Sequence, residues 1–282
     1  MDKYKWGNYI TIRDKFRVYV QELALSLPYL GDVQQEFVNN RADNKSSVYK
    51  VETPVVYNTA LDDITIDDEI KLILVADNPG RREQMAENRR YLVGPSGKIA
   101  QKFFRDNPSL EIDFLKNVII LNKTPIHSPR TVDLRELCRL EGYAEFNLAE
   151  TQRIHPAPKF LGAGQGERKG NSKALPHPLI TALENSQRIM ARLLFQFQEA
   201  LGCPVWITGY SEMRKNGLFE VYTETLKELY SKQKDMFKEI FIFRHFSMNQ
   251  FTIDLKQQAQ TGESVTKSLK RIGTAYRKRI LG

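Results

Sequence analysis

Four short apolar runs alternate along the chain with longer segments whose apolar residues recur every three or four positions. The apolar runs occupy residues 71–75, 118–121, 205–208 and 240–243. Between them, two segments place apolar side chains on one helical face: Ile189, Leu193, Phe197 and Leu201, and then Tyr222, Leu226 and Leu229. Continuous apolar strands that alternate with amphipathic helices indicate a parallel sheet covered on both faces. We therefore predict an α/β fold with three α/β/α layers and a four-stranded parallel sheet.

Helix ends are marked at three places in this pattern. Gly202 follows the helix through Leu201, and glycine commonly ends helices. Ser96 precedes a helical run through Ile99 and Phe103, which predicts that its hydroxyl caps that helix. A further helix, with Phe16, Val20, Leu23 and Leu27 on one face, should end at Pro28.

Composition along the chain suggests three parts. Residues 1–50 form an amino-terminal helical arm and a polar linker, 51–255 form the α/β domain, and 256–282 form a basic carboxy-terminal helix. The α/β domain contains a long insertion at about 131–180, whose part at 161–173 has four glycines and a net positive charge. Loops this long are often lids or binding loops, and a tolerated surface loop is an equally good interpretation.

Polar side chains follow three of the four apolar runs. Asp77, Asn78, Pro79 and Gly80 follow the first run, Asn122 follows the second, and Arg244, His245 and Ser247 follow the fourth. Each group taken alone is explained by ordinary turn chemistry, since Asn, Pro and Gly all favour turns. The carboxyl ends of parallel strands, however, meet at one edge of the sheet, where open α/β folds bind ligands. We therefore expect these groups to share one crevice.

Charge and length add two constraints. The 282 residues carry a formal net charge of +8, and a hydrophobic content of 41% is enough for a sizeable core. The basicity is local, because residues 256–282 hold seven Lys or Arg and only one acid, Glu263. A basic cluster of this kind suits a polyanion such as nucleic acid, and a solvated helix without a partner is about as good an interpretation.

The two cysteines, Cys138 and Cys203, cannot form a four-thiolate metal or iron-sulfur site, so we expect free, mostly buried thiols. The amino terminus lacks an apolar core of signal-peptide length, and no segment reaches the roughly 18 apolar residues of a membrane span. These features predict a cytosolic protein without a membrane partner.

Four short motifs resemble those of the uracil-DNA glycosylase superfamily, in matching order and spacing over roughly residues 70 to 255. They are ADNPG at 76–80, RRYLVGPSGKIA at 89–100, VIILN at 118–122 and HFS at 245–247. The resemblance implies a monomeric DNA-repair enzyme without a metal or redox cofactor. Its expected reaction is base excision, in which the N-glycosidic bond of uracil or a related damaged base is hydrolysed in single- or double-stranded DNA.

The resemblance also implies roles for the strand-end residues. Cleavage of the bond between sugar and base leaves a cationic sugar and an anionic pyrimidine, so a water must be positioned and the charge on the base oxygen O2 stabilised. Asn78 occupies the position of the water-handling Asn in some branches, and Asp77 that of the Glu in the thermostable branch. We favour Asn78, and the alternative for Asp77 is that it only caps a turn.

The amide of Asn122 matches the order of acceptor and donor that uracil presents at O4 and N3–H. A ring N–H of His245 suits base oxygen O2 as charge develops there. The other histidines, His127, His155 and His177, lie in Pro-rich surroundings and are interpreted as loop residues.

The remaining assignments concern the rest of the nucleotide. Ser247 suits a phosphate of the extruded nucleotide, and Met248 or Phe251 suits the wedge that fills the vacated base stack. Further DNA contacts are expected from Gly94, Ser96, Lys98, Arg130 and the loop around Arg168.

Three departures from the family pattern leave alternatives open. Phe246 stands where the family has Pro, Leu92 stands where the thermostable branch has a base-stacking Phe, and the four cluster cysteines of that branch are missing. Tyr91 is the neighbouring residue that would supply an aromatic face. The alternative function is therefore a DNA-binding member of the same fold with altered or lost catalysis.

A nucleotide-dependent phosphotransferase is a different class, suggested by the sequence GPSGK at 94–98. It lacks the earlier Gly of a P-loop, where Leu92 stands, and the Ser or Thr after Lys98.

Overall fold

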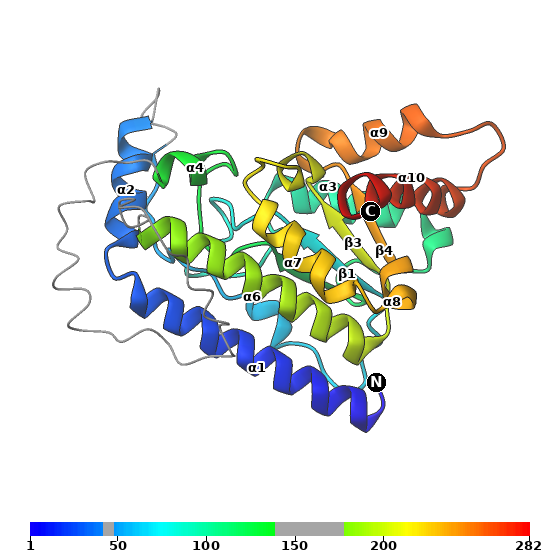
Figure 1. Cartoon of the computed structure of the whole chain (residues 1–282), viewed down its shortest axis with the longest axis horizontal. Coiled ribbons are helices and arrows are strands. Elements are labelled where there is room, and N and C mark those ends of the chain that lie inside the picture. The colour runs from blue at the N-terminus through cyan, green and yellow to red at the C-terminus, as the bar shows by residue number, and fades with distance from the viewer. Residues whose placement is uncertain (42–47, 139–177) are drawn as a thin grey trace, which may run out of the picture.

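The computed structural model describes residues 1–41, 48–138 and 178–282, without the side chains of residues 41 and 178 (Figure 1). Most of the predicted insertion, including the segment 161–173, the loop around Arg168, His155 and His177, lies outside the described residues. Within the described part, four parallel strands form one sheet in the order β2-β1-β3-β4. The strands are β1 (Leu72–Ala76), β2 (Val118–Asn122), β3 (Val205–Thr208) and β4 (Ile240–Phe243). The predicted α/β fold with a four-stranded parallel sheet is therefore confirmed.

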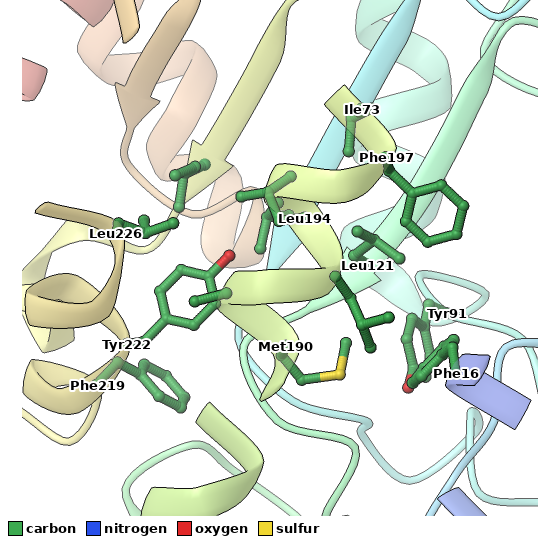
Figure 2. Packing of buried hydrophobic residues seen from close by; sticks show 14 of the residues in the cluster. Phe16, Ile73, Tyr91, Leu121, Met190, Leu194, Phe197, Phe219, Tyr222 and Leu226 are labelled. Atoms are coloured by element: carbon green, nitrogen blue, oxygen red, sulfur yellow. The ribbon is translucent and has the colours of Figure 1, made fainter. Parts of the chain in front are cut away.

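Helices cover both faces of the sheet. One cluster joins residues of α1 (Lys3–Ser26), α6 (Pro178–Leu201) and α7 (Glu220–Tyr230) to alternate strand residues such as Ile73. Figure 2 shows part of this packing and labels Met190 and Phe197 of α6 together with Phe16 of α1. The other cluster joins Phe103 of α3 (Pro95–Asp106) to the intervening strand residues, including Trp206. The period-2 alternation of the strands thus separates two apolar faces.

The amino-terminal arm belongs to the same core as the sheet. Helix α1 buries Tyr9, Ile12, Phe16, Val20 and Leu23, as the periodicity predicts, and ends at Ser26 before Pro28. It packs against α6, and α2 (Leu30–Arg41) follows it.

The predicted cap at Ser96 is wrong. Helix α3 begins at Pro95 with Gly94 as its cap residue, which leaves Ser96 inside the first turn. Proline suits the first helical position because its fixed φ is already helical and its missing N–H has no partner there. Gly97 is required at this helix start, because an added Cβ would lie 1.3 Å from the carbonyl oxygen of Leu92.

Shorter elements connect these units. They are the helices α4 (Asp133–Leu137), α8 (Lys234–Lys238) and α9 (Gln250–Gln258), and the 3₁₀ turns η2 (Thr59–Leu61), η3 (Pro108–Leu110), η5 (Tyr210–Met213) and η6 (Ser247–Asn249). None of the described helices is both long and apolar enough to cross a membrane.

The basic carboxy-terminal helix α10 (Val265–Leu281) is a packed part of the fold. It lies against β4, and an added Cβ at Gly273 would lie 2.7 Å from Cβ of Phe241. The buried Arg277 donates through Nη1 to the carbonyl oxygens of Phe237 at 2.9 Å and Ile240 at 3.0 Å. Helix α10 therefore packs on the sheet through one face, while most of its other basic side chains are exposed.

The packing of α10 predicts that a Gly→Ala substitution lowers thermal stability in α10 and raises it at an uncrowded glycine of α1. Gly273→Ala should lower the melting temperature, because the new methyl meets the fixed base of the Phe241 side chain. Gly7→Ala in α1 has nothing within 4 Å of its Cβ and should raise stability by up to about 1 kcal/mol through helix propensity. Thermal unfolding of both variants measures the difference, and a stabilised Gly273→Ala would contradict the close packing of α10.

Candidate functional site

The strand order places a switch point between β1 and β3. The chain leaves β1 for β2 on one side and later enters β3 on the other, and open α/β sheets bind ligands at the carboxyl ends of such strands. Asp77 follows β1 and Gly209 follows β3. Gly209 has φ of 79°, and an added Cβ would lie 2.3 Å from Oδ1 of Asp77. The carboxylate therefore packs directly against the end of β3, where only glycine leaves room.

A buried lysine that the sequence reasoning missed occupies this switch point. Lys123 is fully buried, forms an ion pair with Asp77, and donates from Nζ to the carbonyl oxygen of Thr208 at 2.5 Å. Its backbone N–H lies 3.0 Å from the carbonyl oxygens of both Ala76 and Asp77. Lys123 thus joins the ends of β1, β2 and β3. Burial lowers the pKa of its ammonium, and the Asp77 carboxylate opposes that shift.

The loop after β2 holds the turn of the first motif. Nδ2 of Asn78 donates to Oγ of Ser128 at 2.9 Å and to the carbonyl oxygen of Pro79 at 3.2 Å. His127 lies in this loop as expected, but it is fully buried, with Nδ1 2.8 Å from the Pro79 carbonyl and Nε2 2.9 Å from the Tyr49 hydroxyl. Burial lowers the pKa of His127 to about 4, so the ring is neutral and donates to Pro79. The donor end of Asn78 is therefore occupied, and its Oδ1 is the end suited to a ligand.

Asn122 ends β2 with an unpaired amide. Its side chain is 1% exposed, and neither Oδ1 nor Nδ2 has a hydrogen-bond partner in the described part of the chain. Asn122 is in register with Ala76, which belongs to the α3-side cluster, so the amide projects from that face. Unpaired buried polar groups are rare, because each costs about 1 to 3 kcal/mol. An amide in this position is therefore a candidate for a ligand contact.

His245 is half-buried after β4, and its ring is oriented by its own loop. Nδ1 accepts the backbone N–H of Ser247 at 2.9 Å, so a neutral ring carries its proton on Nε2. Burial lowers the pKa of His245, with Asp77 opposing this shift and Lys123 adding to it. The ring is thus neutral over a wider pH range and presents an N–H donor.

Residues next to His245 explain one departure from the family pattern. Phe246 is fully buried and stacks on Phe251, with ring centroids 4.3 Å apart. Because Phe251 is 2% exposed, the structure does not support it as the wedge. Met248 is 81% exposed, with a positive φ of 49°, and remains the candidate. Ser247 is half-buried beside it.

The residues expected to stack on a base lie in the core. Tyr91 is 3% exposed, its hydroxyl donates to the carbonyl oxygen of Val56 at 2.6 Å, and it belongs to the buried cluster of which Figure 2 shows a part. Leu92 is also buried and has a positive φ of 54°. Neither side chain therefore supports the predicted stacking.

Glu83, a further residue that the sequence reasoning missed, holds the Leu92 turn to the first motif. Its carboxylate accepts N–H groups from Leu92 at 2.9 Å and from Gly80 at 3.2 Å. Burial raises the pKa of Glu83 to about 7. The two glycine-rich turns are thus joined by one buried carboxyl group.

The residues predicted to contact DNA lie around these turns and differ in exposure. Lys98 is exposed, Ser96 is half-buried and Gly94 is buried at the start of α3. The Arg130 side chain is 59% exposed and pairs with Asp133, while its carbonyl oxygen accepts the hydroxyl of Ser128.

The cysteines and the charged residues leave two further observations. Cys138 is half-buried and Cys203 is buried, both as free thiols, as predicted. Across the described ranges, no three His, Cys, Asp or Glu side chains converge to hold a metal ion.

Comparisons with protein-family models, curated proteins and solved structures find no match to this chain.

Proposed function

We propose that this protein is a DNA glycosylase that hydrolyses the N-glycosidic bond of uracil or a related damaged base. The proposal is supported by the motif resemblance and by the free functional ends of Asn122, Asn78 and His245. Each of these groups follows or ends a parallel strand at the same edge of the sheet. The resemblance alone supports equally a DNA-binding protein without activity, so the chemistry of the three groups carries the argument.

The buried amide of Asn122, which has no hydrogen-bond partner among the residues that the structure describes, is the observation that carries the proposal. Its Nδ2 donor and Oδ1 acceptor suit O4 and N3–H of uracil, which are adjacent and complementary. Cytosine offers the opposite order, so it pairs only if the amide exchanges the positions of its oxygen and nitrogen. The cost of keeping the amide buried is then offset by recognition of the correct base.

The water is best assigned to Asn78. Its Nδ2 is held by Ser128, which leaves Oδ1 to accept a hydrogen bond from the attacking water and so to orient it. Asp77 is less suited to this task, because its carboxylate already faces the Lys123 ammonium and accepts the Thr131 hydroxyl at 3.3 Å. The negative charge of Asp77 is thus largely neutralised within the protein.

The leaving base is assigned to His245. A neutral ring with its proton on Nε2 donates to base oxygen O2, where negative charge grows as the bond breaks. Met248 projects from the same loop and is suited to fill the space that the extruded nucleotide leaves in the stack.

Asn122→Asp should reduce uracil excision at least about tenfold, because the carboxylate replaces the donor offered to O4 and leaves a buried polar group unpaired. The ratio of cytosine to uracil excision should rise. Oligonucleotides bearing U, C, T, hypoxanthine or xanthine, read out as abasic-site cleavage, measure both effects. Asn216→Asp makes the same chemical change on an exposed loop and should leave excision unchanged. If the native chain excises none of these bases but binds DNA, the non-catalytic alternative replaces this proposal.

Asn78→Ala should lower the single-turnover rate about 10²- to 10⁴-fold, as expected for loss of a group that positions the nucleophile. Asn78→Asp should retain most of the rate, because a carboxylate orients water and also accepts its proton. Equal rates for the native protein and a folded Asn78→Ala variant would remove Asn78 from this role.

The packing of α10 means that DNA binding by the basic tail must be tested without truncation. Replacing the exposed Lys267, Lys270 and Lys278 by Gln should weaken DNA binding and flatten the slope of log affinity against log salt by about 0.9 for each lost phosphate contact. Lys232 and Lys234 are exposed in the segment before β4, outside the tail, and their replacement by Gln is the control. An unchanged slope in the tail variant would move the DNA path to Lys98 and Arg130.

A further inference from the structure

The loop that follows the first motif carries three arginines without an acidic partner. Residues 80–90, GRREQMAENRR, which we call the arginine loop, contain four arginines, and all four are exposed. Arg90 forms an ion pair with Asp63. Arg81, Arg82 and Arg89 form no ion pair with any residue that the structure describes.

The acids around the arginine loop neutralise this charge only in part. Glu83 is buried and joins the two glycine-rich turns. Glu87 is exposed, and the exposed Glu52 accepts the backbone N–H of Ala86 through Oε2 at 2.6 Å. The surface of the loop therefore has an excess of positive charge, carried by guanidinium groups that are free to bind an anion.

A buried glutamine fixes the arginine loop to the preceding segment. The amide oxygen of Gln84 accepts the backbone N–H groups of Glu52 at 2.6 Å and Thr53 at 3.2 Å. Its Nε2 donates to the carbonyl oxygens of Lys50 at 3.0 Å and Arg81 at 3.2 Å. All the polar groups of this side chain are thus used to hold the loop, which limits the entropy that the loop loses when it binds a ligand.

Hydrogen bonds also hold the backbone at Arg82 and Arg89. Nδ2 of Asn88 donates to the carbonyl oxygen of Arg82 at 3.0 Å, and the carbonyl oxygen of Arg89 accepts the backbone N–H of Thr59 at 2.9 Å. Arg89 has a positive φ of 41°, which glycine or asparagine adopts at lower cost. The backbone conformation therefore gives no reason for an arginine at this position.

The side chain of Arg81 is held by an aromatic ring, which leaves its charge intact. Its Cζ lies 4.9 Å from the centre of the Tyr49 ring, and the Tyr49 hydroxyl lies 2.9 Å from Nε2 of the buried His127. A guanidinium group that packs on a ring keeps N–H donors at its edge, and these match two oxygens of one phosphate. Because His127 also contacts the Pro79 carbonyl, Arg81 is tied to the turn that contains Asn78.

We propose that the arginine loop binds the phosphate backbone of DNA, through Arg81, Arg82 and Arg89, beside the nucleotide that occupies the crevice. The choice of DNA rests on the proposed function, because the loop begins two residues after Asn78. Several exposed cations on one loop suit a polyanion better than a single small anion, because successive phosphates can each meet a different guanidinium group.

The Arg82→Gln/Arg89→Gln variant of the full chain tests this surface without disturbing the contact between Arg81 and Tyr49. Fluorescence anisotropy with a labelled, undamaged duplex measures the affinity over a series of salt concentrations. The variant should bind at least about tenfold more weakly at low salt, because charge-assisted hydrogen bonds are lost. The slope of log affinity against log salt should flatten by about 1.8, which is about 0.9 for each of two phosphate contacts.

Two matched variants separate a local contact from a change in net charge. Lys232→Gln/Lys234→Gln removes the same charge from exposed positions in the segment before β4 and should leave affinity and slope near their native values. Arg82→Lys/Arg89→Lys keeps the charge and should keep the slope, while it loses affinity because lysine lacks the planar fork of arginine. Thermal unfolding establishes that each variant is folded.

The results distinguish this surface from the proposed function. A folded Arg82→Gln/Arg89→Gln variant with the native affinity and slope overturns the arginine loop as a DNA contact, as does an equal loss in the Lys232→Gln/Lys234→Gln control. Base excision by the native chain would still support the proposed function in either case. If the arginine variant shows the expected losses but the native chain excises no base, the phosphate-binding surface stands and the proposed function is refuted.

Discussion

The buried ion pair between Lys123 and Asp77 is the interaction on which the geometry of the crevice depends. It lies at the switch point of the sheet, where Gly209 alone allows the carboxylate to approach the end of β3. A buried pair contributes little net stability, because desolvation offsets the attraction, but removing one partner costs about 3 to 5 kcal/mol. The main effect of the pair is therefore to fix the positions of the segments after β1, β2 and β3 relative to one another.

Two buried ionisable side chains, His127 and Glu83, connect this arrangement to the surrounding turns by hydrogen bonds. His127 is held neutral by burial and joins the loop after β2 to the Pro79 carbonyl. Glu83 joins the Gly80 turn to Leu92 and is stabilised in its protonated form relative to an exposed carboxyl group. Neither group has a role in the proposed chemistry. Their contribution is to hold Asn78 and the start of α3 in fixed positions, which limits the entropy lost when a ligand binds.

Packing explains the residues at two positions where the chain differs from the uracil-DNA glycosylase motifs that it resembles. Phe246 fills an aromatic cluster with Phe251 and Phe103, which anchors the His245 loop through burial instead of through a rigid Pro. Leu92 adopts a left-handed φ that costs a non-glycine residue about 1 to 2 kcal/mol, and its buried side chain and the bond to Glu83 offset this strain. Base stacking, if the proposed reaction occurs, must come from other side chains.

The sequence by itself determined the strands to within one residue, the helices α1, α6 and α7, and the parallel sheet, because apolar periodicity is a local property of the chain. It also placed Asp77 and Asn122 at one sheet edge, since parallel strands must align their carboxyl ends. It did not identify Lys123 or Glu83, since nothing in the neighbouring residues indicates that their partners lie 46 and 9 positions away. The cap at Ser96 was wrong because Pro95 takes the first helical position, and Phe251, one of the two residues suggested for the wedge, is buried in the aromatic cluster. Only the tertiary structure decided which polar groups are paired and which, like Asn122, have no hydrogen-bond partner among the described residues, because hydrogen bonding and burial are set by contacts between distant segments.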